Sequence, residues 1–452
     1  MGGGPLERLD ANIVQTDDVG GKRCDGTAAD SPGTPERRGF FLEGGTFFDF
    51  GREQANTIRP FFSRRIGLDA NGQPQRIDYG TKLTGQIGSN NIGLLQVRTA
   101  SSGNLPGENF TVLRSKQQFL RQSYAGIMYT RRAEQGTGAP DRHTFGADFQ
   151  LATTTFRGSQ NMSVGAFYLR TTKLPNTPGS AAYGTKFEYP NDRWVGRMSF
   201  YEVQAGYDPA IGFVDRKDER RYNPEFQFGP RPKNSRIVRR FQFQTDHEII
   251  TDLQNRLVTR TLSTGMAVDF QSGDYIRFFV APSYERLRKD FEISKGVILP
   301  NGSAYGFTRY QAQFFTANRR VVQVSSFYNV GTFYSGHRHE FMFNLSVRPR
   351  RGVLLSINNN WNRVELQEGK FSTSLLRFVA STQFSPWISV VNNIQYDSVS
   401  RILGWQSRFR WIVRPGSDIY FVYAQNWIED PTLGRLTLDR SAATKILYTH
   451  RF

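Results

Sequence analysis

The stretch ILGWQSRFRWIVR, residues 402–414, decides the fold, because its side chains alternate in character from one residue to the next. One face is apolar and mostly aromatic: Leu403, Trp405, Phe409, Trp411 and Val413. The other face is polar: Gln406, Arg408, Arg410 and Arg414. Successive side chains of a β-strand point to opposite faces, so this pattern predicts a strand between an apolar and a polar environment. Its length is sufficient to cross a bilayer at a tilt.

Similar segments recur from about Thr81 to the end of the chain, for example FMFNLSVR (341–348) and SDIYFVYAQNWI (417–428). Tight turns alternate along the chain with generally longer links, as outer-membrane barrels alternate short periplasmic turns and longer outer loops. We therefore predict an all-β fold, an antiparallel transmembrane β-barrel of about 18 strands within a range of 16–20. A further strand is predicted to be hidden between residues 205 and 235.

The composition is consistent with a barrel. The chain has 452 residues, of which 38% are hydrophobic and 14% aromatic, with 43 glycines. No apolar run approaches the roughly 18 residues of a membrane-spanning helix, so the sequence excludes a helical membrane protein. The single cysteine, Cys24, excludes an internal disulfide and a cysteine-based zinc site. The start, MGGGPLERLD, lacks the apolar segment of a signal peptide.

Three regions follow from the pattern. Residues 1–38 are predicted to be a disordered or aberrant N-terminal segment, and residues 81–452 the barrel. Residues 39–80 combine aromatic clusters with arginines and lack strand alternation, which predicts a segment that plugs the lumen or forms a periplasmic collar. Its candidate contacts are Glu43, Asp49, Arg64 and Arg65, which would pair in a polar lumen. The alternative for SRRIG (63–67) is a solvated periplasmic turn.

The formal net charge of +18 is consistent with binding to nucleic acid, with binding to anionic lipid, or with an anion-lined pore. The arginines of 402–414 alternate with aromatic residues, which favours a polar lumen over a nucleic-acid surface. We predict that Gln406, Arg408, Arg410 and Arg414 line this lumen and favour anions. No nucleic-acid partner is expected.

The last residues, TKILYTHRF (444–452), continue the alternation to a terminal phenylalanine. Bacterial barrel-insertion machinery recognises such an aromatic end, plausibly by strand addition, so Tyr448 and Phe452 are the predicted insertion signal. The alternative is an ordinary edge strand. The expected location is the bacterial outer membrane with the C-terminus in the periplasm, and the expected partners are membrane lipid, lipopolysaccharide and the insertion machinery.

Catalytic and metal-binding motifs are not found. His337 and His339 of HRHE (337–340) share a strand face, but a solvated loop is the favoured interpretation over a metal site. Residues 246–248, DHE, have no recognisable nucleophile or partner, and no Walker, Rossmann, GxSxG or HExxH motif is present. We predict no enzymatic activity, no metal and no cofactor.

Several pieces carry a resemblance to a known family: ERRGFFLEGGTFFDF (36–50), RPFFSRRIG (59–67), YGTKLTGQIGSNNIGLLQVRT (79–99), NFTVLR (109–114) and IGFVDRKDERRY (211–222). Over about residues 36–452, the chain resembles the outer-membrane barrel family catalogued as domain of unknown function 5916. That family commonly follows a family-9-like carbohydrate-binding module, which this chain lacks. The resemblance implies an outer-membrane barrel, a segment near FFLEG and SRRIG that occupies the lumen, and a link to glycan handling. It brings no catalytic residues.

Three functions stay open at this point. The leading hypothesis is a porin-like channel or transporter for a polar solute, either anionic or a carbohydrate. The second is a non-conducting barrel that displays loops 286–303 and 429–441 to a glycan, to lipopolysaccharide or to a periplasmic partner. The third is an envelope glycan hydrolase, which would need two carboxylates about 5 to 10 Å apart.

Overall fold

The computed structural model describes residues 39–51, 58–68, 75–103, 105–172 and 179–448, and their regular structure is almost entirely β. The described helices are single turns: α1 (Gly39–Leu42), η2 (Gly45–Phe48) and η4 (Ser63–Arg65). None of them has the length and apolar character needed to span a membrane. The predicted all-β class is confirmed.

Within the described residues, 21 strands of 10 to 15 residues form the antiparallel sheet of a β-barrel. The first are β2 (Ile77–Ile87), β3 (Asn90–Thr99), β4 (Glu108–Phe119), β5 (Ser123–Glu134), β6 (Arg142–Phe156), β7 (Gln160–Thr172), β8 (Ala181–Pro190), β9 (Trp194–Val203), β11 (Glu219–Phe228), β12 (Val238–Thr251) and β13 (Leu257–Phe270). The others are β14 (Tyr275–Arg286), β17 (Ala304–Phe315), β18 (Val322–Phe333), β19 (Gly336–Val347), β20 (Val353–Glu365), β21 (Lys370–Gln383), β22 (Ile388–Asp397), β23 (Ile402–Arg414), β24 (Ser417–Asp430) and β25 (Gly434–Leu447). Two short pairs lie outside this sheet: β1 (Ile58–Arg59) with β10 (Phe213–Val214), and β15 (Phe291–Ser294) with β16 (Val297–Leu299).

The strand number of 21 exceeds the predicted value of about 18 and its range of 16–20. β11 is the hidden strand that was predicted between residues 205 and 235. It resembles a loop in sequence because it opens with the charged run Glu219–Arg221. Pairing with the neighbouring strand accommodates these charges, because Arg220 forms an ion pair with Glu202 of β9, with 2.7 Å between Nε and Oε2.

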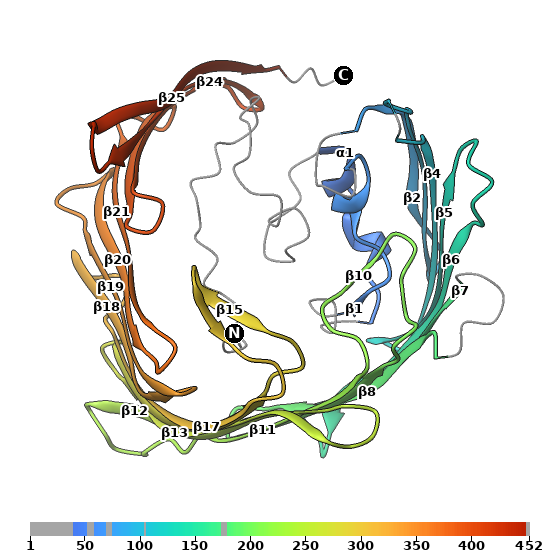
Figure 1. Cartoon of the computed structure of the whole chain (residues 1–452). Coiled ribbons are helices and arrows are strands. Elements are labelled where there is room, and N and C mark those ends of the chain that lie inside the picture. The colour runs from blue at the N-terminus through green and yellow to red at the C-terminus, as the bar shows by residue number, and fades with distance from the viewer. Residues whose placement is uncertain (1–38, 52–57, 69–74, 104, 173–178, 449–452) are drawn as a thin grey trace. The chain divides into compact units, whose positions relative to one another are not determined.

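The chain divides into two compact units, and we describe each by itself. Among the described residues, the N-terminal unit comprises residues 39–228 with 244–261, and the C-terminal unit comprises residues 229–243 and 262–448. In the N-terminal unit, β2 to β9 and β11 each pair with the next strand. In the C-terminal unit, β14 and β17 to β25 do the same (Figure 1). Short connections between neighbouring strands produce this up-and-down order.

The two faces of the C-terminal sheet differ in chemistry. Across β21, β22 and β23, the register places Arg377, Gln395 and Gly404 in one row. The next row, on the opposite face, is apolar: Phe378, Ile394 and Trp405. We call these the polar face and the apolar face. The alternation predicted from residues 402–414 therefore extends to the neighbouring strands.

The prediction of a long loop at residues 429–441 is wrong. β24 continues to Asp430 and β25 begins at Gly434, so only residues 431–433 connect them. The segment resembled a loop because it is polar, but its polar side chains pair across the two strands. Arg435 lies 3.3 Å from Glu429, and the Asn426 amide donates to Asp439 at 2.9 Å.

The predicted loop at residues 286–303 contains the hairpin β15–β16. The hairpin folds onto an apolar cluster at the ends of β17, β18 and β20, which includes Leu299, Phe307, Phe333 and Val364. Gly369 gives the hairpin room, because a Cβ there would lie 2.8 Å from Val297 Cγ2. The connection therefore has its own packed structure.

The turns 271–274 and 316–321 are joined by the Asp274 carboxylate. It accepts hydrogen bonds from the Arg320 guanidinium and, at 2.8 Å, from the Ala317 main chain. These bonds, with that of Arg320 the largest cause, lower the pKa of Asp274 below its ordinary value. A lowered folded-state pKa stabilises the fold above the unfolded pKa of about 3.9, and this contribution is lost as the pH falls below that value.

We expect Asp274→Asn to reduce the acid sensitivity of the protein. Wild type should lose more thermal stability than the variant between pH 6 and pH 3, because only wild type loses the ionised contact. Unfolding temperatures at the two pH values measure this difference. Equal losses would show that Asp274 does not contribute.

Candidate functional site

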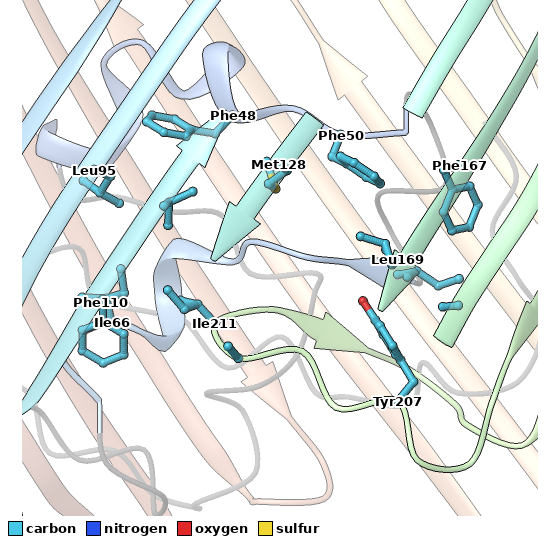
Figure 2. Close-up of a cluster of buried hydrophobic side chains, with 14 of the residues drawn as sticks. Phe48, Phe50, Ile66, Leu95, Phe110, Met128, Phe167, Leu169, Tyr207 and Ile211 are labelled. Atoms are coloured by element: carbon cyan, nitrogen blue, oxygen red, sulfur yellow. The ribbon is translucent and has the colours of Figure 1, made fainter. Parts of the chain in front are cut away.

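A segment from the start of the described chain packs on one face of β3 to β9, within the N-terminal unit. We call residues 39–51 and 58–66 the docked segment. Figure 2 shows several of the buried side chains that join it to the sheet. The segment contributes Phe41, Phe48, Phe50, Ile58 and Ile66, and the strands contribute Leu95, Val97, Phe110, Val112, Met128, Phe167, Leu169, Ala182, Tyr201 and Val203. Burial of each such phenylalanine stabilises the contact by about 1.5–3 kcal/mol.

Two glycines let the aromatic rings lie directly on the sheet. A Cβ at Gly93 of β3 would lie 2.9 Å from Phe48 Cε1, and one at Gly146 of β6 would lie 2.8 Å from Phe50 Cε2. Contacts this short do not occur with a real Cβ atom, so any side chain at these positions would displace the rings. Glycine in a strand often marks such a close approach.

A buried ion pair lies beside Phe50. Arg114 of β4 donates to both carboxylate oxygens of Asp148 of β6, at 2.6 and 2.9 Å, and the two side chains are 0% and 1% exposed. The guanidinium crosses β5 at Gly126, where a Cβ would lie 2.7 Å from Arg114 Nη1. Gly126 is the register partner of Asp148, so the arginine reaches the carboxylate over a strand that has no side chain at that point.

The ion pair also contacts the docked segment. Asp148 Oδ2 accepts a hydrogen bond from the Gly51 main chain at 3.0 Å. The Arg114 guanidinium lies over the Phe50 ring, 5.1 Å from its centre, in a cation–π contact. A buried carboxylate requires such donors because it has lost its water. We call Phe50, Gly51, Arg114 and Asp148 the Phe50 latch.

The connection 204–218 holds the second half of the docked segment. Its strand β10 pairs with β1, and Ile211 accepts a hydrogen bond from the Phe62 main chain at 3.0 Å. The Ala210 main chain in turn donates to Thr144 of β6 at 2.9 Å. Tyr207 is buried in the same cluster, and burial raises the pKa of its hydroxyl. The connection thus ties the docked segment to the sheet.

The structure places the four predicted plug contacts as follows. Glu43 follows α1 and Asp49 follows η2, and both are exposed. The main-chain carbonyl of Glu43 accepts a hydrogen bond from Lys82 of β2. Arg64 and Arg65 lie in η4, where Arg64 is buried and Arg65 is half-buried.

Arg65 belongs to a charged group at the start of β6. It is close enough to Arg142 of β6 for the two charges to interact, and Arg142 forms an ion pair with Asp208. Lys217 also reaches Asp208, at 3.4 Å. The docked segment therefore meets the connection 204–218 through charges as well as through apolar contacts.

Of the four predicted lumen residues of β23, Gln406, Arg408 and Arg410 share the polar face of the C-terminal unit, whereas a register irregularity between Ile412 and Arg414 interrupts the alternation before Arg414. Gln406 is the register partner of Asn393, and Arg408 is exposed. Arg410 forms an ion pair with Asp418 of β24 at 3.0 Å. Arg414 lies over the Tyr448 ring, 4.7 Å from its centre.

Tyr448 directly follows β25 and is exposed, while Phe452 lies outside the described residues. The insertion signal stays a prediction.

The predicted histidine pair lies in β19. His339 Nδ1 is 2.9 Å from the Tyr328 hydroxyl, and His337 is exposed. Within the described part of the chain, no group of three or more His, Cys, Asp and Glu side chains is arranged to hold a metal ion.

The Phe50 latch was missed from the sequence. Its signal is present: Arg114 follows Val112 and Phe110 at alternate positions in NFTVLR, so a charge occupies an otherwise apolar strand face. A buried charge requires a partner. The identity of that partner, Asp148, depends on the register of three strands, which the sequence does not specify.

No protein-family model matches the chain, and no curated protein is similar to it. Among solved structures, the chain is similar to the ferric-catecholate import receptor Fiu from E. coli K12 in its open form. The TM-score is 0.31 with 10% sequence identity, over 79% of this chain and 70% of that chain. A likeness of this size carries no argument about function.

Proposed function

We propose that the protein is an integral β-barrel of the bacterial outer membrane that controls passage of a polar solute, with the docked segment as a plug in its lumen. We further propose that it belongs to the family catalogued as domain of unknown function 5916. The FFLEG piece (40–44) that carries this resemblance lies in the docked segment, and the SRRIG piece (63–67) lies at its end. No covalent chemistry is part of the proposal.

The observation that carries the proposal is the apolar face that remains exposed. In the N-terminal unit it is the face opposite the docked segment, with Leu113, Ile127, Phe145 and Phe149. In the C-terminal unit it is the face opposite the polar face, with Phe278, Tyr310, Trp411 and Phe421. Soluble monomers rarely expose apolar surface this extended, whereas a membrane barrel requires it.

The polar face supports a hydrophilic solute. On β20, Asn358, Asn360 and Asn362 occupy alternate positions of this face, followed across the sheet by Arg377 and Asn393. Amides and guanidinium groups donate hydrogen bonds to hydroxyl, carboxylate and phosphate oxygens. A carbohydrate or another polyhydroxylated or anionic solute therefore suits this surface.

The test is the conductance of the refolded protein in a planar bilayer. Deletion of residues 39–66 should convert a silent or low-conductance protein into one with stable openings, because it removes the plug and leaves β2 intact. The openings should favour anions, since Arg377 and Arg408 lie on the polar face. Silence of both proteins, with insertion confirmed, would refute passage of solutes.

The second candidate is a sealed barrel without transport. The large buried cluster between the docked segment and the sheet favours this candidate. The close packing of two phenylalanine rings on Gly93 and Gly146 and the buried ion pair strengthen the same attachment. A sealed barrel predicts silence also after deletion of residues 39–66. The same recording therefore separates the two candidates.

A further inference from the structure

The turns at one end of the C-terminal strands form a continuous row. Main-chain hydrogen bonds link successive turns: Gln271 to Ile237, Arg348 to Val321, Gln383 to Gly352, and Ile412 to Trp387. Asp274 joins the turn 271–274 to the turn 316–321. We call this row the basic rim; it consists of residues 229–237, 271–274, 316–321, 348–352, 384–387 and 415–416.

The basic rim has a large excess of positive charge. It contains one carboxylate, Asp274, and eight basic residues: Arg231, Lys233, Arg236, Arg319, Arg320, Arg348, Arg350 and Arg351. The connections at the opposite strand ends, residues 287–303, 334–335, 366–369, 398–401 and 431–433, are nearly balanced. They contain Arg288, Lys289, Lys295 and Arg401 against Asp290, Glu292 and Glu368. The two ends of one sheet therefore differ in charge.

Four of these cations are available to a ligand. Within residues 179–448, Lys233, Arg236, Arg350 and Arg351 are exposed and have no acidic partner. By contrast, Arg320 is paired with Asp274. Unpaired cations in a row produce a positive field that attracts anions.

Exposed apolar side chains lie among these cations. Ile237 is 70% exposed and Phe384 68%, and Val321 and Trp387 are also exposed. A rim of arginines mixed with exposed apolar and aromatic side chains is typical of the layer of lipid headgroups at a membrane surface.

An open apolar groove of about 490 Å³ lies above the basic rim on the apolar face. Its lining includes Phe243, Met266, Phe278, Tyr310, Ala312 and Val330, from β12, β13, β14, β17 and β18. The turns 271–274 and 316–321, which belong to the rim, connect four of these five strands.

The groove lies within the depth of one membrane leaflet from the rim. Phe278 follows Asp274 by four residues, which at about 3.4 Å per residue is about 14 Å. The hydrocarbon core of a bilayer is about 30 Å thick, or about 15 Å per leaflet. A lipid with its headgroup at the rim would therefore extend its acyl chain to the depth of the groove.

We propose that the basic rim and the groove form a binding site for an anionic phospholipid. Lys233 and Arg236 on one side of the groove, and Arg350 and Arg351 on the other, attract the phosphates of such lipids, and an acyl chain occupies the groove between Phe278 and Tyr310. This inference rests on the proposed membrane location and is independent of solute passage.

The test is lipid binding by the refolded full chain in detergent micelles, followed by native mass spectrometry during titration with phosphatidylglycerol or phosphatidylcholine. Wild type should bind phosphatidylglycerol at least tenfold more tightly, because each basic side chain near a lipid surface contributes about 1 kcal/mol. The quadruple variant Lys233→Gln/Arg236→Gln/Arg350→Gln/Arg351→Gln should lose this preference. The matched control, Arg288→Gln/Lys289→Gln/Lys295→Gln/Arg401→Gln, should keep it.

A second variant tests the groove without a change of charge. Ala312→Leu fills the groove and should weaken phosphatidylglycerol binding severalfold, whereas Ala442→Leu at an exposed position of β25 outside the groove should not. Equal binding of both phospholipids by wild type, or a preference for lipid A over phosphatidylglycerol, would overturn the inference. Failure of conductance with retained phosphatidylglycerol selectivity would refute passage of solutes and leave the lipid site standing.

Discussion

Replacement of Asp148 by alanine is expected to release the docked segment and lower the free energy of unfolding by about 3–5 kcal/mol. The reason is that Arg114 would stay buried without its partner, since both side chains are almost fully inaccessible. The Gly51 main chain would lose its acceptor as well. Guanidinium unfolding of the protein in lipid vesicles measures the loss, and conductance measures the release.

Two controls make this result specific. Glu225→Ala removes an exposed ion pair with Arg197, and should cost no more than about 1 kcal/mol. The double variant Arg114→Met/Asp148→Leu should recover most of the stability, because it removes the unpaired charge. A loss from Asp148→Ala as small as that from Glu225→Ala would contradict a role for the buried pair.

Replacement of Phe50 by alanine should undock the segment by a different route. Phe50 is 6% exposed and packs against Leu169, Phe167 and the Arg114 guanidinium. Truncation of a buried phenylalanine costs about 3–5 kcal/mol through lost burial and the cavity left behind. Trypsin should then cleave at Arg64 and Arg65 much faster than in wild type.

The matched control is Phe40→Ala. Phe40 belongs to the same segment, but it is 39% exposed and contacts Lys82 at the surface. Its truncation should leave the cleavage rate within a few fold of wild type. If the two variants are cleaved at the same rate, Phe50 does not hold the segment.

The alternation of the strands could be predicted from the sequence because each strand must satisfy two environments at once. Trp405 and Arg408 are assigned to opposite faces by spacing alone, and the pairing of β22, β23 and β24 agrees with that assignment. The strand number was underestimated where charges interrupt the alternation, as in β11. In β11, charged side chains that form cross-strand ion pairs interrupt the alternation of apolar and polar residues. Such pairs cannot be predicted until the register of the strands is known.

The candidate site was also predicted only in part from the sequence. Residues 39–80 stood out because aromatic and arginine residues cluster without a strand period. The side chains that attach the segment were predicted as Glu43, Asp49, Arg64 and Arg65, all within it. The latch attaches it through Arg114 and Asp148 of the strands, which are 34 positions apart in sequence.

The sequence by itself determined the all-β class, the long strands and the two chemically different faces, because a period of two is a local property of the chain. Only the tertiary structure decided that Arg114 reaches Asp148 across Gly126. It also decided that Phe48 and Phe50 pack on Gly93 and Gly146. The alignment of the cations in the rim turns likewise depends on the tertiary structure. These are contacts between strands and segments distant in sequence. They depend on register, which is fixed by the packing of the whole sheet rather than by any one strand.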